Sequence, residues 1–146
     1  MSEVIMRGME DLDQSLEHLV VKYPDRSGEF LRKQALETRR NIVKESKQQL
    51  KTDTGERYSL GRAGSYSVSQ VKGYGKDQEV ELSAKSPHFH LIEHGHQLTG
   101  HYPSKTPLGE VHGYHIMDTE RKRREVKMPN DCAKWADELL TEEGFL

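Results

Sequence analysis

The segment Ser86–His96 constrains the fold more than any other stretch, because a proline near its start and a glycine near its end fix the length of one helix. It contains four of the eight histidines in the chain. Pro87 suits the first turn of a helix, where its missing N–H leaves no hydrogen bond unmade. Gly95 suits the left-handed position that ends a helix. The segment therefore predicts a helix of roughly two turns, which joins a sheet to the rest of the core.

One interpretation of this helix is a zinc site. His90, Glu93 and His94 fit the H-x-x-E-H pattern of inverted zinc peptidases. Residues four apart share a helical face, so both imidazoles could bind one metal while Glu93 acts as general base on a zinc-bound water. However, so short a helix needs outside support to hold two ligands rigidly, and no compact acidic or cysteine motif supplies a third. We therefore predict no catalytic, cofactor-binding or metal-binding residues, and keep a small zinc-dependent hydrolase as the alternative.

The other interpretation of the same helix is structural. Phe89 and Ile92 are three positions apart and form a small apolar face that can dock on a sheet. The histidines then flank this face as partly exposed polar residues. This interpretation agrees better with a short helix that lies between Pro87 and Gly95.

Composition predicts one domain, residues 1–146, with a thin core. Hydrophobic residues make up 33% of the chain and charged residues 32%, so we expect partners to complete the burial of apolar surface. Cys132 is the single cysteine, which excludes a disulfide framework and favours a core position next to Trp135. No apolar run approaches membrane-spanning length and no signal peptide is recognisable, so the sequence predicts a soluble protein made in a reducing cytoplasm, without membrane contact.

Charge is distributed in blocks although the formal net charge is only −2. The chain before Asp25 is mostly acidic, residues 26–51 are mostly basic, and Arg121–Arg124 form a basic cluster. Such blocks are usually solvated helix faces. A nucleic-acid-binding module that uses the two basic segments is a further alternative, although near-neutral net charge gives no global signal for it.

Apolar periodicity predicts two N-terminal helices and a helical C-terminus. The first helix covers residues 8–22, Tyr23-Pro24-Asp25 breaks it, and the second covers residues 27–51. We expect these two helices to form an antiparallel pair. A charged helix is expected from Asp118 to about Lys127, interrupted by Pro129. The last helix then begins at residue 130 or 131, with Cys132, Trp135, Ala136, Leu139 and Leu140 on a stripe that closes the sheet.

The middle of the chain predicts strands and loops. Residues 52–64 are polar and suit a loop. Tyr66 and Val68 alternate with serines, and Val80, Leu82 and Ala84 alternate with polar residues, so they form a hairpin around a turn at residues 73–77. Residues 97–113 contain two prolines and three glycines and predict a long polar excursion that reaches a partner. Tyr114 and Ile116 suit a returning strand. The fold class is therefore α+β: two N-terminal helices and a C-terminal helix packed on a small antiparallel sheet with a long hairpin or excursion.

This order of elements, with Ser86–Gly95 at its centre, resembles the neck or tail-completion (minor tail component, head–tail joining) family of long-tailed phages and prophages. In that family a sheet leads into a short segment that ends with an acid, a variable residue and Gly, as Glu93-His94-Gly95 does here. A loop then returns to a C-terminal helix, much as residues 111–119 do. The resemblance covers residues 8–142, through short motifs, and the histidine richness and Pro129 depart from it.

The resemblance implies a structural virion protein with no catalysis and no cofactor, located where the tail meets the head and made in the cytoplasm of the host bacterium. It implies self-association into a ring, most simply a hexamer that matches a sixfold tail. Its partners would be the other connector and tail proteins, and the DNA that passes through the channel.

Overall fold

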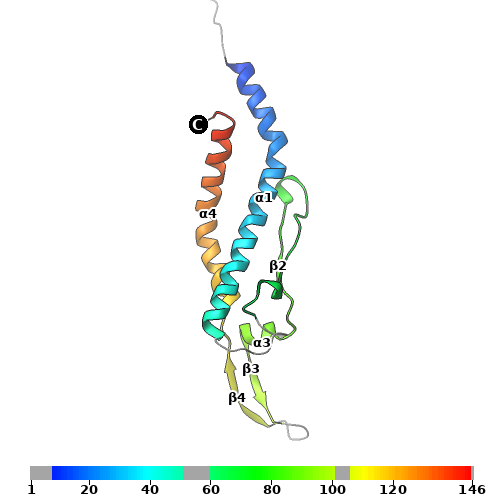
Figure 1. Cartoon of the computed structure of the whole chain (residues 1–146), viewed down its shortest axis with the longest axis vertical. Helices are drawn as coiled ribbons and strands as arrows, with labels where there is room; N and C mark the ends of the chain where they lie inside the picture. The colour runs from blue at the N-terminus through cyan, green and yellow to red at the C-terminus, as the bar shows by residue number, and fades with distance from the viewer. Residues whose placement is uncertain (1–7, 51–59, 101–105, 146) are drawn as a thin grey trace, which may run out of the picture.

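The structure is a computed structural model that describes residues 8–50, 60–100 and 106–145. It is a mixed α+β fold, as the sequence predicts: a long N-terminal helix, a C-terminal helix and two small antiparallel sheets of two strands each. The two long helices lie side by side and one hairpin projects beyond their lower end (Figure 1). The elements are α1 (Met9–Leu50), β1 (Tyr66–Val68), β2 (Leu82–Ala84), α3 (Phe89–His94), β3 (Gly95–Thr99), β4 (Pro107–His112) and α4 (Ile116–Glu142), with short 3-10 turns η1 (Ala63–Ser65) and η2 (Gly75–Asp77).

The predicted break at Pro24 is wrong, because α1 is one helix of 42 residues that contains this proline. A proline inside a helix removes one backbone hydrogen bond and crowds the preceding turn. Tertiary contacts offset that cost here. The carbonyl of Pro24 accepts a hydrogen bond of 2.8 Å from Gln78 Nε2, and Tyr23 packs against Trp135 with ring centroids 5.9 Å apart. The expected antiparallel pair of N-terminal helices therefore does not exist.

The C-terminal part is likewise one helix, and α4 runs through Pro129. The expected strand at Tyr114 and Ile116 is wrong, since Ile116 begins α4, and the expected helix start at Asp118 lies in its first turn. Trp135 stacks on Phe30 of α1 at 5.2 Å between ring centroids. The apolar stripe of α4 therefore packs on α1. The expectation that this stripe closes the sheet is wrong.

The hairpin of β1 and β2 confirms the predicted pairing. Tyr66 lies opposite Ala84 and Val68 opposite Leu82. The turn between the strands requires glycine: Gly73 has φ of +80°, and a Cβ there would lie 2.3 Å from the carbonyl oxygen of Asp77.

The expected polar excursion is a second hairpin. Strand β3 pairs with β4 from Gly95 opposite His112 to Thr99 opposite Pro107, with an irregularity between Leu98 and Thr99. The sequence suggested a loop because both faces of this hairpin are largely solvated, so its apolar residues are few. Residues 101–105 of the excursion, and residues 51–59 of the expected loop at 52–64, lie outside the described residues.

The core lies where the C-terminal half of α1 meets the first hairpin and the start of α4. Ile42, Leu60, Tyr66 and Ile116 are buried together. Phe89 and Ile92 of α3 pack against this cluster, which confirms the apolar face predicted for the histidine helix. In the described part of the chain, the buried hydrophobic residues are these four and Leu139. The core is as thin as the composition predicts.

Candidate functional site

Glu93 does not face an open site, because its carboxylate caps the start of α4. The side chain is buried. Oε1 accepts a hydrogen bond of 2.9 Å from the backbone N–H of Asp118, and Oε2 accepts one of 3.1 Å from that of Met117. The first N–H groups of a helix have no partner within the helix and favour negative charge. His115, the N-cap residue of α4, has no side-chain cap of its own, so a residue from α3 supplies it.

Two glycines allow this close crossing between α3 and the start of α4. A Cβ on Gly95 would lie 2.3 Å from the carbonyl oxygen of Val111, and one on Gly113 would lie 2.4 Å from that of Glu93. The crossing is held by the N–H of His115, which donates to the carbonyl of Glu93 at 3.1 Å. Gly95 has φ of +79° and ends α3 as the sequence predicts.

The histidines of the candidate zinc motif do not converge with Glu93 on a common point. His90 and His94 are exposed, and the nearest ring to His94 is that of His115, with centroids 6.3 Å apart. Among the residues that the structure describes, no three His, Cys, Asp or Glu side chains are close enough together to hold a metal ion. His101 lies outside those residues. The H-x-x-E-H pattern here therefore marks a helix that caps another helix.

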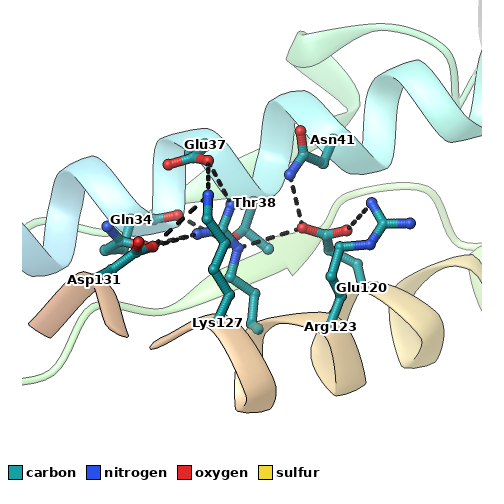
Figure 2. Close-up of polar contacts among 9 residues, drawn as sticks. Gln34, Glu37, Thr38, Asn41, Glu120, Arg123, Lys127 and Asp131 are labelled. Carbon is teal, nitrogen blue, oxygen red and sulfur yellow. Dashed lines mark hydrogen bonds and ion pairs between the residues drawn. The ribbon is translucent and has the colours of Figure 1, made fainter. Parts of the chain in front are cut away.

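One residue of the basic cluster 121–124, Arg124, takes part in a polar seam between α1 and α4. Figure 2 shows Glu37 and Asn41 of α1 facing Glu120 and Lys127 of α4 in this seam. Arg124 lies 3.0 Å from Glu37 of α1 and 3.4 Å from Glu120. Asn41 donates to Glu120 at 2.9 Å. Lys127 pairs with Glu37 at 2.8 Å. The remaining cations of the cluster also have partners: Arg121 with Asp118 and Glu125, Lys122 with Asp118, and Arg123 with Glu120.

The contacts in the seam also shift the pKa values of two of its residues. Hydrogen bonds from Lys127 and Arg124 lower the pKa of Glu37 below the ordinary glutamate value. The same contact with Glu37 raises the pKa of Lys127. Opposite charges at such distances favour the ionised form of each group. The seam therefore links α4 to α1 through Arg124 and Lys127, which are paired with Glu37.

An apolar groove lies beside the seam, between α1, β2 and α4. Its volume is about 440 Å³. Its floor is formed by Leu31, Ala35, Ile42, Leu82, Met117 and Met128, and Arg121, Arg124 and Glu125 line the α4 side. The groove was not predicted from the sequence, because the groove exists only if the two long helices run unbroken past each other.

The N-terminal end of α1 extends beyond α4 (Figure 1). The C-terminal end of α4 meets α1 near Lys22, whose Nζ lies 2.6 Å from Glu143. Residues 9–17, here called the tip, precede that contact. The stripe Met9, Leu12, Leu16 and Val20 is exposed, with fractions of 53%, 41%, 44% and 72%. Helical spacing in the sequence predicts a stripe of Met9, Leu12, Leu16 and Leu19, which we expected a pair of N-terminal helices to present to the sheet. In the structure, Leu19 is half-buried and Val20 extends the exposed stripe.

The second hairpin also exposes apolar side chains. Leu98 on β3 and Leu108 on β4 are 43% and 69% exposed. The hairpin of β3 and β4 projects beyond the lower end of α1 and α4 (Figure 1). The candidate functional features are thus surfaces: the tip, the groove and the second hairpin.

Comparison of the chain with known protein families, with characterised proteins and with solved structures gives no match. Within the described residues, no helix combines the length and the apolar character needed to cross a membrane.

Proposed function

We propose that this protein is a structural subunit of a phage neck or tail-completion assembly. In this role copies of the chain form a ring, most simply a hexamer, that joins the tail to the head. The ring forms on virion particles assembled in the cytoplasm of the host bacterium. Its neighbours are connector and tail proteins, and its channel passes DNA. The proposal starts from the resemblance stated above.

The observation that carries the proposal is the amount of uncovered apolar surface on a thin core. The stripe that begins in the tip exposes four apolar side chains and the second hairpin exposes two, at opposite ends of the elongated molecule. Scattered exposed apolar residues are ordinary, but aligned stripes are typical of surfaces that other proteins cover. A two-stranded sheet is also marginally stable alone. Both features suit a subunit that neighbours complete.

Neither alternative is favoured by a specific contact. A hydrolase would need Glu93 free to take a proton from water, whereas both of its carboxylate oxygens accept backbone hydrogen bonds. A nucleic-acid-binding module would use the cluster 121–124, in which Arg124 is engaged with α1. The exposed Arg121, Lys122 and Arg123 are paired with acidic residues of α4. The structural role requires no such group.

The test is the composition and form of virus particles. Mass spectrometry of purified particles from the phage or prophage that encodes the chain should detect it in a few copies per particle. Deleting its gene should give filled heads and separate tails, seen by negative-stain microscopy. Its absence from purified particles, or normal joining of heads and tails in the deletion, would reject the proposal.

A further inference from the structure

We propose that the tip of α1 in one copy of the chain inserts its apolar stripe into the apolar groove of a second copy. The inference deepens the proposed function, on which its biological meaning rests, by naming the contact through which copies join. It is carried by the match between two described surfaces in apolar pattern and in charge.

The tip has two adjacent stripes. Met9, Leu12, Leu16 and Val20 lie at the spacing of one helical face. Glu10, Asp13 and Glu17 repeat the same spacing one position later, so they flank the apolar stripe on one side. Residues 9–17 contain four acidic residues and no basic one. The tip is therefore an apolar ridge with an acidic border.

Such a tip does not suit pairing with another tip. Two copies paired antiparallel and face to face would bring their acidic borders together in the same contact, and like charges held close oppose association. In a parallel pair, each acidic border would lie on the opposite side of the contact and would gain no basic partner. The partner surface must instead be apolar with a basic border.

The groove meets both requirements. Leu31, Ala35 and Met128 contribute apolar lining, and Arg121, Arg124 and Glu125 line the side formed by α4. Arg124 is held by Glu37 and Glu120, so Arg121 supplies the accessible positive charge. The helices that form it are basic. Residues 31–42 of α1 contain four basic residues and one acidic residue, and residues 117–128 of α4 contain five and three. Arg121 is 61% exposed and its present ion pairs lie on the surface, where such pairs contribute little and exchange readily.

The tip cannot fill the groove of its own molecule. Leu16 and Leu31 belong to one continuous helix, α1, and lie roughly 22 Å apart along its axis at 1.5 Å per residue. A rigid helix cannot fold back over that distance, so a tip that enters the groove belongs to a second copy. An amphipathic helix that lays its apolar face in a hydrophobic groove is a recurrent mode of recognition.

The contact is heterologous, since it joins two different surfaces. Each copy then offers one tip and one groove, and repetition of the contact gives a closed ring if the rotation between copies closes. This is the symmetry that a ring at the base of a phage head requires.

The test uses full-length protein in sedimentation velocity experiments at low ionic strength. The wild type should associate as its concentration rises, and the association should weaken in high salt. Leu16→Asp places a negative charge on the apolar stripe of the tip, and Ala35→Glu places a negative charge in the groove. Each variant alone should remain monomeric. An equimolar mixture should form a dimer and stop there, because only one tip and one groove remain competent.

The matched control is Val21→Asp. Val21 is 77% exposed and lies off the apolar stripe, in line with the acidic border of Glu10, Asp13 and Glu17, so this variant should associate at least as strongly as the wild type does. Arg121→Glu, at an exposed position, gives a second groove variant if Ala35→Glu fails to fold by circular dichroism. Combining Arg121→Glu with Glu17→Arg should restore association at least tenfold relative to Arg121→Glu alone.

Three results would overturn the inference: a wild type that stays monomeric up to millimolar concentration at low salt, a variant mixture that does not dimerise, or equal loss of association in Val21→Asp. The proposed function is tested separately by particle composition. Detection of the protein in particles together with a failed mixing experiment would reject this contact and leave the assembly role standing.

Discussion

Glu93 in α3 accepts a backbone hydrogen bond from Asp118 in the first turn of α4, across 25 positions of the chain. With the second bond to Met117, this contact joins the histidine helix to the long helix that packs on α1. The residue that a motif search would nominate as a catalytic base thus holds two elements together.

Replacing Glu93 should therefore affect folding. Glu93→Ala leaves two partly buried N–H groups without their acceptor, and we expect it to lower the free energy of unfolding by about 2 kcal/mol. Glu93→Gln keeps one acceptor oxygen and should cost less than Glu93→Ala. Urea denaturation followed by circular dichroism measures both. His90→Gln removes the nearby imidazole without touching the cap and should be close to neutral, and equal losses in Glu93→Ala and His90→Gln would contradict the capping role.

Some elements of this fold can be predicted from local sequence, and others depend on contacts between distant residues. The pattern of Tyr66, Val68 and Leu82 alternates over a few residues, so the first hairpin could be predicted. Gly95 likewise ends α3 by local geometry, whereas Pro87 lies in the turn before the N-cap residue His88 and not in the first helical turn. The cap that Glu93 provides depends on residues 117 and 118, far along the chain, and the local sequence of residues 115–118 does not predict it.

The two prolines mark where local inference fails. Proline disfavours a helix interior by about 3 kcal/mol, and Pro24 and Pro129 accordingly suggested breaks. Contacts from distant residues, such as Gln78 to the carbonyl of Pro24, outweigh that preference. The groove and the projecting tip both follow from these unbroken helices, so neither surface could be predicted from the sequence.

Trp135 tests the packing of α4 on α1. The ring stacks on Phe30 but is only partly buried, so Trp135→Ala should cost about 2–3 kcal/mol, below the range for a fully buried aromatic. Trp135→Phe retains an aromatic stack and should lose less than half as much. Thermal denaturation of both variants measures the difference. A loss below ~1 kcal/mol for Trp135→Ala would mean that the helix pair is held elsewhere.

The seam predicts a dependence of stability on acid pH. The pKa of Glu37 is lower in the folded protein than in the unfolded chain, because Lys127 and Arg124 donate to its carboxylate. The stabilisation is therefore complete above the ordinary glutamate pKa and is lost as pH falls through the lower, folded-state value. Denaturant midpoints measured from neutral to acid pH should decline less steeply in Glu37→Gln than in the wild type. Parallel curves for the two proteins would show that the seam carries no such linkage.

The most direct measurement of the assembly account is disulfide cross-linking inside purified particles. Leu16→Cys and Ala35→Cys, combined with Cys132→Ser, place one thiol on the tip and one in the groove. Both positions lie on the single helix α1, too far apart for an intramolecular bond. Oxidation should give a ladder of linked copies that ends at a closed hexamer on a non-reducing gel, while Val21→Cys with Ala35→Cys should give none. Particles that contain the double-cysteine protein only as monomer after oxidation would contradict the account.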